Sequence, residues 1–216
     1  MSSLPAASAA SPSHGWIGAS AAAARLKSET DEMLRVDHAG EVGAVEIYRG
    51  QAWALRGAPI AALLEEMQRG EEAHVRTLDT LLAERRVRPS ALVPLWRAAG
   101  FALGAASALL GSKSAMAVTV AVETSISAHY NDQVRALLAR GGVAGGGGGI
   151  ENKSVASVEG GGDGELVRVF ALHRDEEIAH HDTAVAHGAR DTPAFPVINA
   201  AVSLGCALAI QVAKRV

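Results

Sequence analysis

The chain of 216 residues contains a single cysteine, and only 4% of its residues are aromatic. One cysteine, Cys206, excludes a disulfide within the chain and a metal site built from several thiolates. Because Cys206 stands in an apolar stretch, we interpret it as a buried and unreactive thiol. The net charge of −3 argues against nucleic-acid binding, for which a basic surface is typical.

Charged side chains are also missing from the first 24 residues, which are rich in Ser, Ala and Pro. A transit peptide for an organelle lacks acids and contains many Ser, but it usually contains Arg as well. A disordered leader fits the composition equally well. A secretory signal does not fit, because no basic segment precedes a continuous apolar core. We therefore predict a leader or transit peptide over residues 1–27 and one domain over residues 28–216.

The apolar residues after the leader recur at helical spacing, and the 49% hydrophobic content consists mostly of Ala, Val, Leu and Ile. Pro and Gly punctuate this pattern. The predicted helices cover residues 32–55, 60–83, 92–111, 115–139, 166–187 and 197–212. Residues 141–164 are the part of the chain densest in Gly, so we predict a flexible surface insertion there.

Four of the predicted helices carry glutamates and histidines in a repeated arrangement. Two Glu-x-x-His pairs occur, and a lone glutamate on an earlier helix precedes each pair. Residues three apart on a helix share a face, so each pair can bind the same metal ion or neighbouring ions. Two such pairs and two further glutamates are the ligand set of carboxylate-bridged di-iron sites in four-helix bundles. The candidate ligands are Glu41, Glu71, His74, Glu123, Glu177 and His180.

The residues alone leave alternatives open. A single Glu-x-x-His pair arises easily by chance, and Glu72, Glu176 and His181 stand beside the candidate ligands. A solvated charged face would account for many of these acids. It accounts poorly for Glu123, which interrupts an apolar run over residues 117–122, where an unpaired carboxylate would be costly. We therefore predict that Glu123 is buried with a proton, a partner or a metal ion.

Several further blocks of sequence are similar to the demethoxyubiquinone hydroxylases of ubiquinone biosynthesis. They agree with that family in order and spacing, and they extend from residue 34 to the C-terminus, interrupted by the Gly-rich region. One departure is Thr124, where members of the family often have a second Glu. The blocks are LRVDHAGE at 34–41, IYRGQ at 47–51, RP at 88–89, PLW at 94–96, GFALG at 100–104, AVE at 121–123, HYN at 129–131, RDEE at 174–177 and HHD at 180–182.

The resemblance implies an all-α fold, a ferritin-like four-helix bundle with additional apolar, membrane-associating helices. It selects the six candidate ligands over the neighbouring acids and implies that they bind two iron ions. By the same resemblance, Glu71 and Glu177 are candidates for bridging carboxylates, and Glu41 and Glu123 for terminal ones. Tyr130 and His129 stand about two helical turns beyond Glu123 and are candidates for a proton or electron relay. A packed aromatic side chain is the alternative for Tyr130.

The implied activity is that of a non-haem di-iron monooxygenase. Members of the family use O2 and two electrons to hydroxylate the ring of a polyprenyl quinone, demethoxyubiquinone, and NADH is the expected electron donor. Two alternatives remain. A ferritin-like iron-storage or peroxide-scavenging protein uses much the same ligands, and a non-catalytic quinone-binding scaffold would need the quinone site alone.

Two apolar segments, at residues 98–111 and 197–212, offer a way to reach a lipid-soluble substrate. Both are shorter than the roughly 20 residues that span a bilayer, so we predict a monotopic protein whose helices lie in one leaflet. Packing of the two segments as bundle core is the alternative. Because the leader lacks acids, we predict the matrix side of the mitochondrial inner membrane, with the cytoplasmic face of a bacterial plasma membrane as the alternative. A lipid-carrier protein, a ubiquinone-biosynthesis complex and a second copy of the chain are the expected protein partners.

Overall fold

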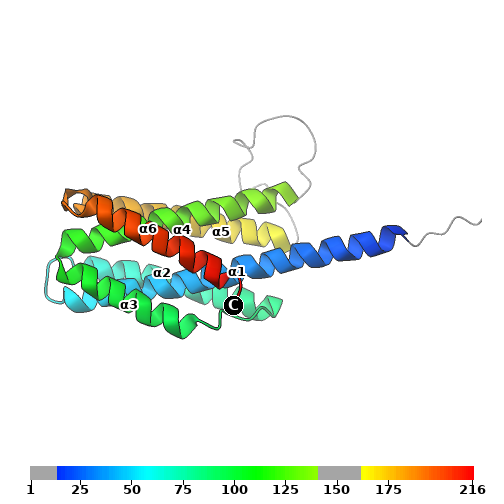
Figure 1. Ribbon diagram of the computed structural model, residues 1–216, viewed down its shortest axis with the longest axis horizontal. Coiled ribbons are helices and arrows are strands. Elements are labelled where there is room, and N and C mark those ends of the chain that lie inside the picture. Colours follow the sequence, from blue (N-terminus) through cyan, green and yellow to red (C-terminus); the bar gives the residue numbers. More distant parts are fainter. Residues whose placement is uncertain (1–13, 141–161) are drawn as a thin grey trace, which may run out of the picture.

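The computed structural model describes residues 14–140 and 162–216, and all regular structure in these residues is helical (Figure 1). A short 3-10 helix, Ala189–Asp191, precedes the last long helix. The prediction of an all-α protein is therefore confirmed. The six α-helices are α1 (His14–Ala54), α2 (Ala61–Arg85), α3 (Val93–Leu109), α4 (Ser112–Arg140), α5 (Gly162–Ala186) and α6 (Phe195–Ala213).

The largest difference from the predicted helices lies at the start of α1. This helix begins at His14, inside the predicted leader, and its N-terminal part projects beyond the other helices (Figure 1). The Ala-rich run over residues 19–24 favours helix strongly enough to extend α1 in this direction. Residues 1–13 and 141–161 lie outside the described part of the chain, and the assignment of a leader and a flexible insertion stays a prediction. Since α5 begins at Gly162, the last three residues of the predicted insertion are helical.

The helices form two similar halves. Helix α1 packs against α2 and α3, and α4 packs against α5 and α6. Each half therefore consists of a helix with a lone glutamate, a helix with a Glu-x-x-His pair, and an apolar helix. Helices α1, α2, α4 and α5 together form the four-helix bundle, which agrees with the predicted ferritin-like fold, and α3 and α6 are additional helices lying against α1 and α4 (Figure 1).

Two apolar clusters fill the interior of the bundle. The first contains Leu34, Leu78, Tyr130 and Phe170, among others, and draws on α1, α2, α4 and α5. The second contains Tyr48, Leu64, Met67, Met116 and Val120. Each cluster contains one of the two tyrosines of the chain.

Helices α1 and α3 approach each other so closely that no side chain fits between their backbones at three positions, Gly50, Gly100 and Gly104. A methyl group added at Gly104 of α3 would lie 2.0 Å from the carbonyl oxygen of Ile47. A methyl group added at Gly50 of α1 would lie 2.3 Å from the carbonyl oxygen of Phe101. Close helix packing through small residues is common in membrane-embedded helices.

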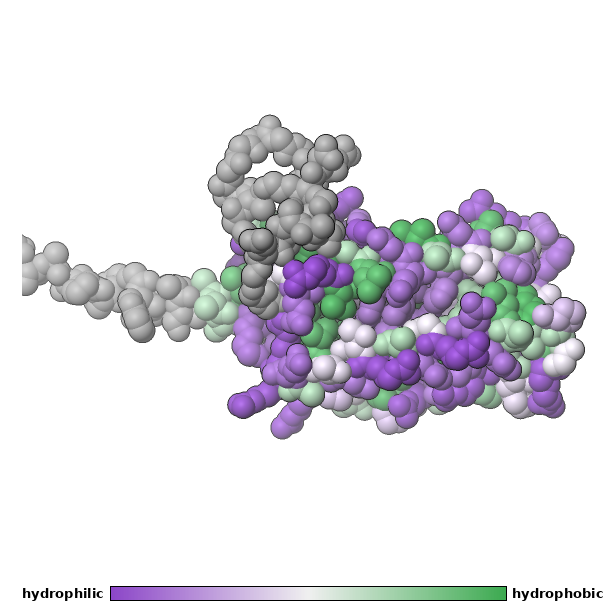
Figure 2. Space-filling view, turned by 180° about the vertical axis from the view of Figure 1, so that it is seen from behind, coloured by the Kyte–Doolittle hydropathy of each residue, from purple (hydrophilic) through white to green (hydrophobic). Residues whose placement is uncertain are grey.

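The outer surface divides into an apolar and a polar side. Most of the large hydrophobic side chains that are exposed lie on α3, α6 or immediately after α3, including Leu95, Leu109, Leu110, Leu204 and Leu208. Figure 2 shows the side of the molecule turned away from the viewer in Figure 1, and its surface is mostly hydrophilic. The alternative that both apolar segments are ordinary bundle core is therefore wrong, because their outer faces have no protein over them in the described part of the chain.

Candidate metal centre

The six predicted ligands come together in the middle of the bundle, and we call them the Glu/His cluster. The two lone glutamates project from α1 and α4, and the two Glu-x-x-His pairs project from α2 and α5. Five of the six side chains are almost completely buried, and the His180 side chain is 17% exposed. The prediction that Glu123 is buried is thus confirmed, with 1% of its surface exposed.

The cluster divides into two overlapping groups of potential ligand atoms. Within each group, one atom from every residue lies within 4.8 Å of the others. One group contains Glu41 and His74 and the other contains Glu123 and His180, whereas Glu71 and Glu177 belong to both. This is the arrangement of two adjacent metal positions that share two carboxylates.

The shared glutamates direct one oxygen toward each histidine. In Glu71, Oε2 lies 3.3 Å from Nδ1 of His74, and Oε1 lies 2.8 Å from Nδ1 of His180. In Glu177, Oε1 lies 3.0 Å from Nδ1 of His74, and Oε2 lies 3.6 Å from Nδ1 of His180. A carboxylate whose two oxygens face two different ligand sets has the orientation required of a bridging ligand.

The inward-facing atoms of the cluster lack hydrogen-bond partners. Both oxygens of Glu71 and Glu177 and the Nδ1 atoms of His74 and His180 are buried, and none forms a hydrogen bond of acceptable geometry. Buried polar atoms without partners are rare and costly in folded proteins. Carboxylate oxygens and imidazole nitrogens are also suitable iron ligands. The residues therefore fit a pair of metal ions.

Charge balance supports the same conclusion. Four glutamates share a buried volume, and burial raises the pKa of Glu71 to about 7 and that of Glu123 well above its usual range. Burial by itself lowers the pKa of His180, but the adjacent Glu177 and Glu71 outweigh it and raise this pKa to about 10. Two divalent cations would carry four positive charges and could neutralise four ionised carboxylates.

Contacts outside the cluster orient its histidines. The Nε2 atom of His74 lies 2.6 Å from Oε2 of Glu176, so this carboxylate fixes the ring and leaves Nδ1 facing inward. A metal-binding histidine commonly donates its second nitrogen in this way. Gly70 leaves space for the other ring, since a methyl group at this position would lie 3.2 Å from Nε2 of His180.

Two tyrosines contact the cluster, and the sequence motifs pointed to Tyr130 but not to Tyr48 on α1. The hydroxyl of Tyr48 donates a hydrogen bond to Glu123, and the hydroxyl of Tyr130 donates one to Glu41. His173, also missed, is buried beside Tyr130, and its ring stacks on that of His74 with centroids 4.1 Å apart. One available signal was the spacing, because both tyrosines follow a candidate ligand glutamate by seven residues.

Other polar residues considered from the sequence lie away from the cluster. The Nε2 atom of His129 lies 3.6 Å from Oδ1 of Asp37, and no contact between His129 and the cluster is found in the described residues. His38 pairs with Asp79 at 3.1 Å. Asp37 and His38 stand in the interior of α1. Asp182 pairs with the neighbouring His181 on the surface and does not orient a ligand.

An apolar groove runs along the outer side of the two helices that carry the lone glutamates. Its volume is about 430 Å³. Helices α3 and α6 form its walls, with Trp96, Leu103, Cys206 and Ile210 among the residues that line it. Gly40 of α1, which is adjacent to Glu41, and Val122 of α4, which is adjacent to Glu123, also line the groove. The groove thus lies directly outside the Glu/His cluster.

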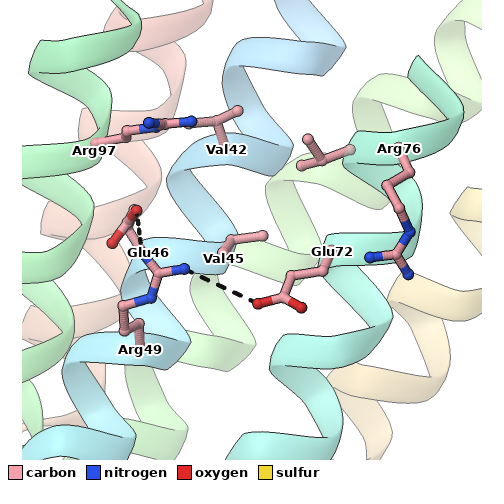
Figure 3. A pocket seen from close by; sticks show the side chains of 8 residues that line it. Val42, Val45, Glu46, Arg49, Glu72, Arg76 and Arg97 are labelled. Carbon is pink, nitrogen blue, oxygen red and sulfur yellow. Dashed lines mark hydrogen bonds and ion pairs between the residues drawn. The ribbon is translucent and has the colours of Figure 1, made fainter. Parts of the chain in front are cut away.

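A second hollow, of about 320 Å³, is charged and lies between α1, α2 and α3 (Figure 3). Arg49 pairs there with Glu46 at 2.6 Å and approaches Glu72 to 4.0 Å (Figure 3). None of the six cluster residues lines this hollow. The acids of this hollow, Glu46 and Glu72, pair with Arg49 inside it. We therefore assign the hollow no part in the metal centre.

The fold and the cluster define a class of protein: a ferritin-like four-helix bundle with the donor set for two metal ions and an apolar groove beside it. Within that class, the chain belongs to the COQ7 family, because residues 28–213 match the family model described as "Ubiquinone biosynthesis protein COQ7".

Relatives in animals, bacteria and fungi support this membership. The chain is 40% identical to "NADPH-dependent 3-demethoxyubiquinone 3-hydroxylase, mitochondrial" of Rattus norvegicus, over 88% of this chain and 79% of the relative. It is 44% identical to "3-demethoxyubiquinol 3-hydroxylase" of Rhodospirillum rubrum, over 86% and 78% of the two chains. It is 38% identical to "5-demethoxyubiquinone hydroxylase, mitochondrial" of Saccharomyces cerevisiae, again over 86% and 78%.

Proposed function

We propose that the chain is a non-haem di-iron monooxygenase that hydroxylates the ring of demethoxyubiquinone in ubiquinone biosynthesis. The observation that carries this proposal is the orientation of Glu71 and Glu177, which each direct one oxygen to His74 and the other to His180. The names of the family and of its relatives, which specify hydroxylation of demethoxyubiquinone or demethoxyubiquinol, supply the substrate class.

In this proposal the Glu/His cluster would hold two iron ions, with Glu71 and Glu177 as the shared carboxylates, Glu41 and Glu123 as terminal ligands and the two histidines as nitrogen ligands. Bound iron supplies the ability to activate O2 after reduction by two electrons. In the overall reaction a ring C–H bond becomes a C–OH group with one oxygen atom of O2. The other oxygen atom leaves as water after taking up two electrons and two protons.

The apolar groove is the proposed site of the quinone. A polyprenyl tail is a long hydrocarbon, and the groove is lined almost entirely by apolar residues from four helices. Because Gly40 and Val122 line it beside Glu41 and Glu123, a quinone whose tail lies in the groove has its ring close to the cluster. A substrate with a long apolar tail and a reactive ring fits an apolar groove that lies beside a buried polar site.

The exposed faces of α3 and α6 form the proposed membrane-binding surface. Among the described helices, α6 is the only one of sufficient length and hydropathy to cross a membrane. However, α6 packs along α4, which carries Glu123 of the Glu/His cluster. If α6 crossed the bilayer, α4 and its buried glutamate would be drawn toward the lipid, where a carboxylate is costly. We therefore propose that both helices lie in one leaflet, at the matrix side of a mitochondrial inner membrane or at the cytoplasmic face of a bacterial one.

A reduced nicotinamide nucleotide is the proposed source of electrons. NADH was expected from the sequence, whereas the name of the rat relative specifies NADPH, so the two donors should be compared directly. A proton or electron relay is proposed for Tyr130, which contacts Glu41. Among the described residues His129 contacts Asp37 and Gln133 and no residue of the cluster, so any part that it takes in a relay is indirect. A lipid-carrier protein, a biosynthetic complex and a second copy remain the proposed protein partners.

The experiment combines iron-loaded protein, O2, NADH or NADPH, and demethoxyquinones with short and long tails. We expect hydroxylated product from the wild type, equal product from Glu66→Ala, which alters an exposed glutamate of α2, and none from Glu177→Ala. Consumption of peroxide or storage of iron without any hydroxylated product would instead favour the ferritin-like alternative. Binding of quinone without turnover would favour the scaffold.

A variant in the groove tests the substrate site separately. Gly205 lies in the groove lining with no atom within 4 Å of an added methyl group, so Gly205→Leu fills the groove without a clash at its first carbon. We expect a higher KM for the long-tailed quinone and an unchanged metal content. An unaltered KM for that substrate would show that its tail lies elsewhere.

A further inference from the structure

The only two tyrosines of the chain occupy matching positions in the two halves of the bundle. Tyr48 follows Glu41 by seven residues on α1, and Tyr130 follows Glu123 by seven residues on α4. Seven residues are about two helical turns, so each tyrosine lies on the same face of its helix as the glutamate before it. Both tyrosine side chains are 1% exposed.

The hydrogen bonds of these tyrosines cross between the two halves. The Tyr48 hydroxyl on α1 donates to Oε1 of Glu123 on α4, at 2.5 Å. The Tyr130 hydroxyl on α4 donates to Oε1 of Glu41 on α1. Each lone glutamate is therefore held by a tyrosine from the opposite half and not by the tyrosine of its own helix.

Each hydrogen bond occupies one carboxylate oxygen and leaves the second one available. The Oε2 atoms of Glu41 and Glu123 are buried and have no hydrogen-bond partner. In Glu71 and Glu177, by contrast, both oxygens lack a partner. The distribution of hydrogen bonds thus separates two carboxylates with one available oxygen from two carboxylates with both oxygens available.

We propose that Tyr48 and Tyr130 are positioning residues that each fix the terminal carboxylate of the opposite half, so that this carboxylate binds its metal ion through one oxygen. The inference rests on the proposed di-iron function and adds to it a cause for the different roles of the four glutamates. A carboxylate held at Oε1 cannot rotate to offer both oxygens, whereas Glu71 and Glu177 are free to bridge.

The two halves are not equivalent, because Tyr130 has an additional neighbour. The Nδ1 atom of His173 lies 3.1 Å from the Tyr130 hydroxyl oxygen and 3.9 Å from Oε1 of Glu41. If the Tyr130 hydroxyl were removed, His173 would need only a small shift to donate to Glu41 directly. Besides its hydrogen bond to Glu123, Tyr48 has an edge contact with the ring of His180, at 6.1 Å between centroids, and no comparable second donor to Glu123 is found among the described residues. Loss of the Tyr48 hydroxyl should therefore have the larger effect.

Titration of the metal-free protein with Co²⁺, followed by visible absorption, tests the proposal without any turnover. Tyr48→Phe and Tyr130→Phe remove the hydroxyl and keep the ring that fills the core. His74→Ala and His180→Ala identify which binding step belongs to which metal position. We expect Tyr48→Phe to weaken the position of Glu123 and His180 by about 10- to 100-fold, the usual effect of losing an outer partner of a metal ligand. Tyr130→Phe should weaken the other position less, and adding His173→Leu should increase its effect.

Double-mutant cycles test the crossing itself. Effects on Co²⁺ affinity should be strongly non-additive for Tyr48→Phe with Glu123→Gln and close to additive for Tyr48→Phe with Glu41→Gln. The melting temperatures of the metal-free Phe variants should fall only modestly, because the ring still fills the core and each variant loses a single buried hydrogen bond.

Three results would overturn the proposal. If the wild type binds two Co²⁺ ions and the Phe variants bind them equally tightly, the tyrosines do not position ligands, although the di-metal function stands. If Tyr48 couples to Glu41 instead of Glu123, the crossed assignment is wrong. A wild type that binds no metal ion refutes both this inference and the proposed function.

Discussion

Substitution of Gly104 by alanine tests the close approach of α1 and α3. The added methyl group would lie 2.0 Å from the carbonyl oxygen of Ile47 and 2.8 Å from its carbonyl carbon. Comfortable carbon–oxygen contacts begin at about 3.3 Å, so the two backbones must separate by roughly 1 Å. The obstacle cannot rotate away, because it is backbone inside a helix.

The cost in free energy of unfolding comes from overpacking and from the dispersion energy that is lost when the two helices separate. Overpacking a core typically costs 1 to 3 kcal/mol, and a gap of about 1 Å forfeits up to half of the dispersion energy between the separated surfaces. We expect Gly104→Ala to destabilise the protein by about 3 kcal/mol. For a chain of this length that corresponds to a fall in melting temperature of roughly 6 to 12 °C. Displacement of α3 should also widen the apolar groove and weaken binding of the quinone.

Thermal unfolding followed by circular dichroism measures the effect, and Gly205→Ala is the matched control. Gly205 also lies within an apolar helix, but no atom is within 4 Å of an added methyl group, so alanine should stabilise α6 by up to about 1 kcal/mol. Gly50→Ala should resemble Gly104→Ala, and the double variant should cost less than the sum, since one displacement of α3 relieves both clashes. A melting temperature of Gly104→Ala equal to that of the wild type would refute the packing argument.

Four further predictions concern the metal centre, the surface and the pH dependence of stability. Glu176→Gln should lower Co²⁺ affinity about 10- to 100-fold by weakening the outer hydrogen bond of a ligand histidine, whereas Asp182→Asn on the surface should leave it unchanged. Chelation of the metal should lower the melting temperature, because free metal at 100 times its Kd adds about 2.7 kcal/mol per site, and calorimetry with and without Co²⁺ measures this. Leu204→Ser on α6 should reduce flotation with anionic liposomes without changing the melting temperature, and Leu172→Ser, on α5, should not reduce it. Burial raises the pKa of Asp37 well above its usual range, so the folded state holds this proton more tightly than the unfolded chain and stability falls as the pH rises above about 4. Asp37→Asn removes that loss, and its gain in melting temperature over the wild type should increase between pH 5 and pH 8.

The sequence by itself determined the helices and the residues of the cluster. Helix periodicity is local, so apolar spacing and the positions of Pro and Gly located six helices with ends close to the observed ones, apart from the start of α1. Glu-x-x-His spacing is local as well, and it placed both members of a pair on one face. The polar position of Glu123 inside an apolar run predicted its burial correctly, because an isolated carboxylate there needs a partner.

Only the tertiary structure decided how these residues face one another. Which oxygen of Glu71 points to which histidine depends on the packing of α2 against the other helices, and no periodicity encodes it. The crossed bonds of Tyr48 and Tyr130 join residues 75 and 89 positions apart. The same holds for the contact of Gly104 with Ile47 and for the groove, whose walls come from both halves. These features arise where separate helices meet, and a pattern read along one helix carries no information about its neighbours.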